Sequence, residues 1–91
     1  MTIIEGKRYD LRKLYQVPDA DTREAGGVKR EGVWITKSGR VIVETYSIWE
    51  NRNTHGVEGT HYHFADEWEI ARLADELGDP RLTALVPVGE D

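Results

Sequence analysis

Apolar and polar side chains alternate along residues 32–50, GVWITKSGRVIVETYSIWE, with the period of two that is typical of strands. The stretch is dense in Val, Ile, Thr, Tyr and Trp, which strands favour because branched and aromatic side chains pack well on a pleated surface. The TKSG segment at its centre suits a type I turn with Gly39 in the left-handed region, followed by a bulge. We therefore predict a β-hairpin that places Trp34 opposite Ile42.

The alternation sorts the side chains of this hairpin onto two faces of a sheet. The first face, which we expect to form the core, holds Val33, Ile35, Val41, Val43, Thr45 and Trp49. The second, the outer sheet face, holds Trp34, Arg40, Ile42, Glu44, Tyr46 and Ile48. Either residues 7–16 or 82–88 cover the outer sheet face, or it stays open as an aromatic binding surface. The pattern leaves both arrangements open.

A helix is predicted over residues 66–78. Asp66 suits the N-cap position, where its carboxylate accepts the backbone N–H of Glu69, and Glu69 completes a capping box by reaching back. Gly78 suits the left-handed residue that ends a helix, and the following Asp79-Pro80 pair prevents continuation. Apolar residues recur at helical spacing and form one stripe, which consists of Ile70, Leu73, Ala74 and Leu77.

The segment THYHF, residues 60–64, predicts a third strand directly before this helix. We expect Tyr62 and Phe64 to turn toward the helix. His61 and His63 then point to the outer sheet face.

These elements predict an α+β fold, in which an antiparallel sheet of three or four strands carries one main C-terminal helix on one face. Ninety-one residues are enough for a single domain, 1–91. Residues 17–31 combine a proline, a Gly-Gly pair and mixed charges, which predicts a mobile loop. Residues 7–16 are compatible with either a strand or a short helix, and 82–88 with an added edge strand.

The charge is unevenly distributed along the chain. Residues 1–40 hold nine Lys or Arg and six Asp or Glu, whereas residues 41–91 hold three and eleven, so the net charges are +3 and −8. Phosphate neutralisation needs clustered Lys and Arg, so direct binding of nucleic acid is not expected. The acidic half favours a protein partner with a basic surface, such as a nucleic-acid-binding surface.

Other properties of the sequence limit the chemistry. The chain has no cysteine, which excludes disulfides and cysteine metal sites. No apolar run reaches the eighteen or so residues of a membrane span, so we expect a cytoplasmic protein without a membrane partner. A glycine-rich phosphate loop and a G-x-S-x-G elbow are both missing, so we expect no cofactor and no enzymatic activity.

The helix carries Trp68 on the side opposite Ile70, beside Arg72 and Asp75, where it should face solvent. Either Trp68 packs over the stem of Arg72, or it contacts a partner. The predicted partner-binding residues on the helix are Trp68, Glu69, Arg72, Asp75 and Glu76. Those on the outer sheet face are Trp34, Arg40, Glu44 and Tyr46.

A metal site is the first alternative. His61 and His63 lie on one face of a strand, and imidazole is a common ligand of zinc, copper and nickel. The segment HYHFADE resembles the first ligand segment of cupins, which would add Glu67 as a ligand. No histidine follows His63 to supply a second cupin motif, so His55 or Glu58 would have to complete the site.

Two further resemblances concern the build of the chain. Within residues 32–78, SGRVIVE and FADEWEIARLAD resemble the second strand and helix start of three-strand-plus-helix DNA-binding modules, namely those of plant ethylene-response factors and the arm-binding domains of phage integrases. Those modules carry arginines along the outer sheet face, where this chain has only Arg40. A small, acidic, cysteine-free chain of this build also resembles phage-encoded inhibitors of host defence, anti-CRISPR proteins above all.

The second resemblance implies a non-catalytic inhibitor that works in the host cytosol. It would occupy a basic surface of a nucleic-acid-handling complex, such as a CRISPR effector. A metal-binding domain and a DNA-binding module are the alternatives. The identity of the partner, the stoichiometry and the source stay open.

Overall fold

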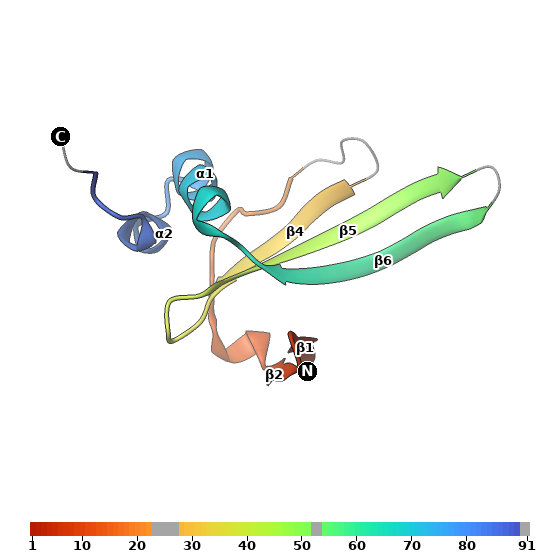
Figure 1. Ribbon diagram of the computed structural model, residues 1–91, viewed down its shortest axis with the longest axis horizontal. Helices are drawn as coiled ribbons and strands as arrows, with labels where there is room; N and C mark the ends of the chain where they lie inside the picture. Colours follow the sequence, from red (N-terminus) through yellow and green to blue (C-terminus); the bar gives the residue numbers. More distant parts are fainter. Residues whose placement is uncertain (23–27, 52–53, 90–91) are drawn as a thin grey trace.

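The computed structural model describes residues 1–22, 28–51 and 54–89, and within them the side chains outside 48–58. It confirms the predicted α+β class (Figure 1), with a four-stranded antiparallel sheet in the order β3-β4-β5-β6 and a small β1-β2 sheet. The strands are β1 (Thr2–Ile4), β2 (Lys7–Tyr9), β3 (Tyr15–Gln16), β4 (Val28–Ile35), β5 (Val41–Asn51) and β6 (Thr54–Phe64). The helices are the 3₁₀-helix η1 (Leu11–Lys13), α1 (Glu67–Leu77) and α2 (Pro80–Leu85).

The β4–β5 hairpin has the predicted register, with Trp34 opposite Ile42. Gly39 has a φ of 86°, the left-handed conformation that the turn requires and that glycine adopts without a Cβ clash. The backbone N–H of Thr36 donates to the carbonyl of Arg40 at 2.8 Å, which closes the turn. This part of the fold follows from local sequence alone.

Helix α1 also has the predicted limits and covers the predicted sheet face. The Asp66 carboxylate accepts the backbone N–H of Glu69 at 2.8 Å, and Gly78 ends the helix with a φ of 63°. Figure 1 shows α1 and α2 on one side of the sheet. The core between them consists of Val17, Ala20, Val33, Val41, Val43, Leu73, Ala74 and Leu82.

The outer sheet face is covered by the N-terminal segment, which answers a question that the sequence left open. Figure 1 shows β1, β2 and η1 on the side of the sheet opposite α1. Trp34 and Ile42 are buried there together with Ile4. Partly buried side chains that complete this second core are Tyr9, Leu11, Leu14, Tyr62 and Phe64. The sheet therefore has a hydrophobic core on each face.

The prediction for the side chains of β6 was wrong by one residue. In β6, Phe64 pairs with Ile42 of β5, and Tyr62 pairs with Glu44, so both aromatic side chains lie on the outer sheet face. His63 pairs with Val43 and therefore lies on the side of α1. The reason is the second core, which needs the aromatic side chains of β6 and so leaves the histidines for the helix side.

Residues 82–88 do not form the edge strand that we considered. Helix α2 begins at Pro80, and the Asp79 carboxylate accepts the backbone N–H groups of Arg81 and Leu82 at 2.9 and 3.1 Å. The same Asp-Pro pair that ends α1 thus starts a new helix, because proline is favoured in the first turn, where its missing N–H is not needed.

Two other segments differ from the expectation. The loop predicted over 17–31 is shorter, because β4 already begins at Val28, and the backbone N–H of Thr22 donates to the carbonyl of Arg30 at 2.9 Å. Residues 23–27, also part of that prediction, lie outside the described residues. The segment that was compatible with strand or helix contains both, in the succession β2, η1 and β3.

Candidate partner-binding surface

The outward face of α1 carries an exposed tryptophan. Trp68 is 85% exposed, and it lies beside Arg72 and Asp75 as predicted. A shallow hollow of about 680 Å³ runs along this face and is lined by Asp66, Trp68, Glu69, Ala71, Arg72 and Asp75. We call these residues the Trp68 surface. The apolar stripe of α1 points the other way, into the core, so packing does not use Trp68.

Glu69 has a structural partner that the sequence did not indicate. Its carboxylate lies 2.8 Å from Nε2 of His63 on β6 and ties the first turn of α1 to the edge of the sheet. The capping box is therefore only half as predicted, because Asp66 caps Glu69 but the Glu69 side chain reaches across to the strand.

Glu76 also ties α1 to the sheet. Both of its carboxylate oxygens accept hydrogen bonds from the guanidinium of Arg30 on β4, at 2.9 and 3.3 Å. Arg30 is held in place by a further hydrogen bond to the carbonyl of Ala20. The hydrogen bonds from Arg30 lower the pKa of the Glu76 carboxyl below its ordinary value of 4.5. Glu76 therefore stabilises the packing of α1 on the sheet and is not a free surface charge.

Asp75 and Glu67 are the carboxylates of α1 that remain available. Both are exposed, and neither forms an ion pair within the described part of the chain. The cation–π contacts among the described residues do not involve Trp68, so we find no Arg72 guanidinium stacked on it. The indole of Trp68 is therefore open to a partner.

Trp34 on the outer sheet face is not available to a partner. Only 8% of Trp34 is exposed, and its indole lies across Gly32, where an added Cβ would stand 2.5 Å from a ring carbon. Arg40 is also committed, since its guanidinium lies 3.5 Å above the ring of Phe64 and 3.2 Å from the carboxylate of Glu5.

Glu44 and Tyr46 lie further along the same face and are half-buried. A hydrogen bond to Glu44 raises the pKa of the Tyr62 hydroxyl. Tyr46 pairs with Lys29 on one side and with Thr60 on the other. The four predicted residues of the outer sheet face thus do not form an open aromatic patch. Leu11 and Leu14 cover this face from the segment 7–16, one of the covers that the sequence left open, and Ile4 is the covering residue that the sequence analysis missed.

The histidines lie on one face of β6, but on the side of α1. No group of three or more His, Asp or Glu side chains suited to a metal ion occurs in residues 1–22, 28–47 and 59–89. His63 is hydrogen-bonded to Glu69, whereas the cupin resemblance pointed to Glu67. The side chains of His55 and Glu58 lie outside the described residues.

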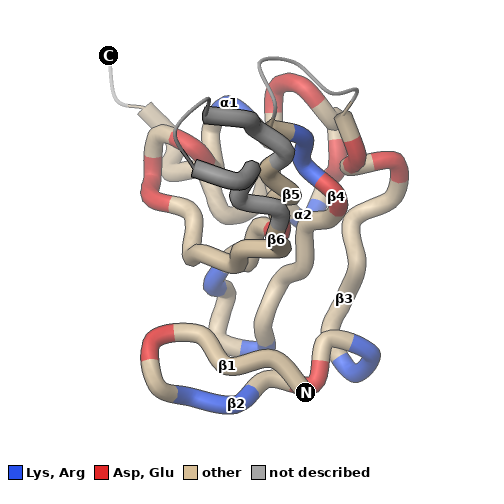
Figure 2. Tube along the Cα trace, turned by 90° about the vertical axis from the view of Figure 1, so that its right-hand side faces the viewer, with Lys and Arg blue, Asp and Glu red and all other residues tan. Residues whose placement is uncertain are grey.

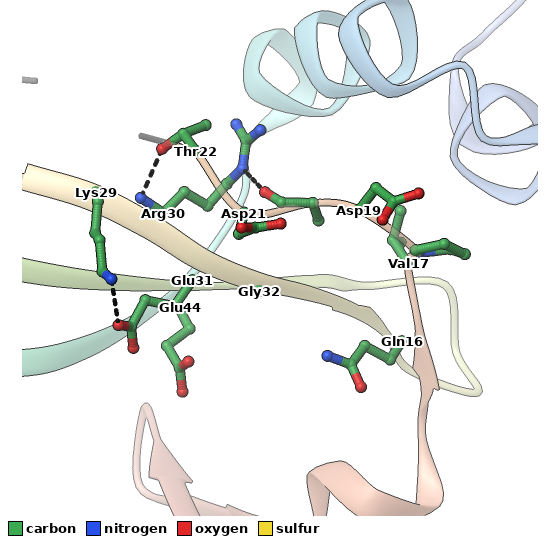
Figure 3. Close-up of a pocket in the computed structure, with 12 residues that line it drawn as sticks. Gln16, Val17, Asp19, Asp21, Thr22, Lys29, Arg30, Glu31, Gly32 and Glu44 are labelled. Carbon is green, nitrogen blue, oxygen red and sulfur yellow. Dashed lines mark hydrogen bonds and ion pairs between the residues drawn. The ribbon is translucent and has the colours of Figure 1, made fainter. Parts of the chain in front are cut away.

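Two more hollows were not foreseen. One, of about 570 Å³, lies between the segment 16–22 and β4, and Figure 3 shows Arg30 reaching across it toward that segment. Its carboxylates include Asp19, Asp21 and Glu31, the last 3.5 Å from Nζ of Lys29. The other hollow, of about 370 Å³, has a basic lining and lies between η1, the β4–β5 turn and α2.

Among the described residues, no helix is long and apolar enough to cross a membrane. No protein-family model, curated protein or solved structure matches the chain.

Proposed function

We propose that this chain is a non-catalytic binding protein that inhibits a nucleic-acid-handling complex, such as a CRISPR effector. The Trp68 surface of α1 would dock on a basic surface that the complex uses for nucleic acid. The observation that carries this proposal is the 85% exposure of Trp68 on an acidic helix whose apolar stripe packs on the core on the opposite side.

The exposed side chain of Trp68 has no packing role in the fold. A tryptophan in solvent contributes little to folding, whereas a tryptophan buried in an interface is among the strongest contributors to binding. Asp75 and Glu67 stand near it without ion-pair partners in the described residues. Such carboxylates attract a basic surface over several ångströms and raise the rate of encounter.

The net charge of −8 for residues 41–91 supports the same kind of partner. Nucleic-acid-binding surfaces are rich in Lys and Arg because they neutralise phosphates. An acidic chain that occupies such a surface competes with nucleic acid directly and needs no catalytic group.

The two alternative functions have no specific observation in their favour. DNA-binding modules of the three-strand-plus-helix type present the outer sheet face to DNA, and here the N-terminal segment covers that face. A metal site at His61 and His63 stays a prediction, which metal analysis of protein purified without a His tag would test.

The test begins with partners captured from a host lysate and identified by mass spectrometry. The purified partner is then loaded with labelled nucleic acid and titrated with the chain. We expect the chain to displace the nucleic acid, and nucleic acid in excess to displace the chain. Simultaneous, independent binding of both ligands would contradict inhibition by occupancy, and a partner without a basic surface would contradict the proposal altogether.

A further inference from the structure

The hollow of about 370 Å³ between η1, the β4–β5 turn and α2 differs in charge from the other two. Its lining consists of Lys13, Leu14, Tyr15, Ile35, Thr36, Lys37 and Arg81. The three cations come from three separate elements, and no Asp or Glu lines the hollow. We call it the basic groove. Like charges that converge on one hollow repel one another, so this arrangement has an electrostatic cost that a bound anion would relieve.

The cations of the basic groove, Lys13, Lys37 and Arg81, form no close ion pairs among the described residues 1–22, 28–47 and 59–89. Asp79 is the carboxylate closest to Arg81 in sequence, but it is 6% exposed and already accepts hydrogen bonds from the Tyr15 hydroxyl and two backbone N–H groups. The groove therefore presents positive charge that an anionic ligand would compensate.

Arg81 gives the groove a planar surface as well as a charge. Its guanidinium carbon lies 4.1 Å from the centre of the Tyr15 ring, so the guanidinium is stacked on an aromatic side chain. The hydroxyl of Tyr15 donates to Asp79 at 2.7 Å and so fixes the ring. Nucleobases stack on guanidinium planes and aromatic rings in proteins that bind single strands.

We infer that the basic groove binds single-stranded nucleic acid, with a base stacked on Arg81 and the adjoining phosphate near Lys13 and Lys37. Its volume lies at the lower end of the range of ligand pockets, which suits one nucleotide of a longer strand. An acidic peptide would use the charges but not the stacked plane, so nucleic acid fits the groove better.

This inference goes beyond the proposed function and does not depend on it. The sequence analysis predicted no direct binding of nucleic acid because the C-terminal half is acidic. The basic groove would be an exception to that prediction. Two of the three cations belong to the N-terminal half, and Figure 2 shows further Lys and Arg, in blue, along β2.

The test is fluorescence anisotropy of a labelled oligothymidylate titrated with the full chain over a series of salt concentrations. We expect binding at low salt that weakens as salt rises, with a slope of about 0.7 per phosphate contact. The double variant Lys13→Ala/Lys37→Ala should lose about tenfold in affinity and show a shallower salt dependence. Absence of binding by the parent chain at low salt would overturn the inference.

The matched control is Lys7→Ala/Arg8→Ala, which changes the net charge equally at exposed residues of β2 outside the groove. It should bind within about twofold of the parent, because only diffuse charge is lost. Equal losses of affinity in the two double variants would show that oligothymidylate is held by diffuse charge attraction, and would contradict binding in the basic groove. Circular dichroism melts check that both variants fold as the parent does.

Arg81→Lys separates stacking from charge, because lysine keeps the charge but has no planar group. We expect a clear loss of affinity for oligothymidylate and little change for labelled oligoglutamate. If this variant binds oligothymidylate as tightly as the parent does, no base stacks on Arg81 and that part of the inference is wrong. Oligoglutamate that binds the parent as tightly as oligothymidylate would assign the groove to acidic peptides instead.

Discussion

The outer sheet face and the outward face of α1 each contain one tryptophan that the sequence predicted as a partner contact, and the two differ in exposure. Trp34 is 8% exposed beneath the N-terminal segment, whereas Trp68 is 85% exposed. The difference is not in the residue or its local pattern. It lies in whether another segment of the chain needs to bury its own apolar side chains against that face.

The carboxylates of α1 divide in the same way. Glu76 is held by Arg30 and Glu69 by His63, whereas Asp75 has no ion-pair partner in the described residues. Glu76 thus stabilises the fold, whereas Asp75, its neighbour in sequence, remains available to a partner. Which carboxylates stay available depends on the strand side chains beside the helix, here Arg30 and His63, which the tertiary structure brings to it.

The largest expected effect separates the two tryptophans by stability. Trp34→Ala should lower the free energy of unfolding by about 3–5 kcal/mol, because it removes the centre of the second core and leaves a cavity. Trp68→Ala should change it by less than about 0.5 kcal/mol, because the side chain is in solvent. Denaturant unfolding of both variants measures this difference, and equal losses would break the comparison.

The next effect concerns the glycine beneath Trp34. Gly32→Ala should cost about 1–3 kcal/mol, because the new Cβ would overlap the indole, which must shift in a packed core. The same substitution in a Trp34→Ala background should cost much less, because the obstacle is gone. A double-mutant cycle from chemical denaturation gives both values, and additive costs would show that the clash is not the cause.

A smaller effect is expected for the Glu76–Arg30 pair. Glu76→Gln should cost up to about 1 kcal/mol near neutral pH, because the carboxylate is partly exposed and solvent screens the pair. Asp75→Asn is the matched control, since it removes the same charge one residue away without breaking an ion pair.

The pH dependence of this pair has a defined sign. The pKa of Glu76 is lowered in the folded state, so the pair stabilises the fold above the ordinary value of 4.5 and loses this contribution as the pH falls through the folded pKa. The stability difference between the parent and Glu76→Gln should therefore be constant from neutral pH down to about pH 4.5 and shrink below it. A difference that grows in acid would contradict the assignment.

The smallest effect on stability is expected at Asp75. Asp75→Asn should leave the melting temperature unchanged but slow association with a basic partner at low salt, because the lost charge no longer steers the encounter. Asp21→Asn, an exposed change of equal charge outside the Trp68 surface, serves as the control. If both variants associate at the same rate, the steering comes from net charge alone.

The sequence predicted the elements that local interactions determine. Alternation and turn chemistry set the β4–β5 hairpin around Gly39, and the Asp66 and Gly78 caps set both ends of α1. These features depend on residues within a few positions of one another, so a single chain is enough to identify them.

The sequence could not decide whether a distant segment covers the outer sheet face, and it turned the side chains of β6 the wrong way. Whether Trp34 is exposed depends on Ile4 and Leu14, which lie twenty or more residues away, and the orientation of β6 depends on the same cover. The structural roles of Glu69 and Glu76 depend on which strands lie beneath α1. The exposure of Trp68, in contrast, could be predicted from helical geometry, because the apolar stripe of Leu73 and Leu77 determines which side of the helix faces solvent.

The central claim is that the Trp68 surface of α1 holds the partner, and one comparison tests it most directly. Surface plasmon resonance against the captured partner would compare the parent chain with Trp68→Ala and with Ile3→Ala, an exposed apolar change on β1. We predict that Trp68→Ala raises the dissociation rate and costs at least about 2 kcal/mol, roughly thirtyfold in Kd, while Ile3→Ala binds as the parent does. Parent-like binding by Trp68→Ala, in protein with an unchanged melting temperature, would contradict the claim.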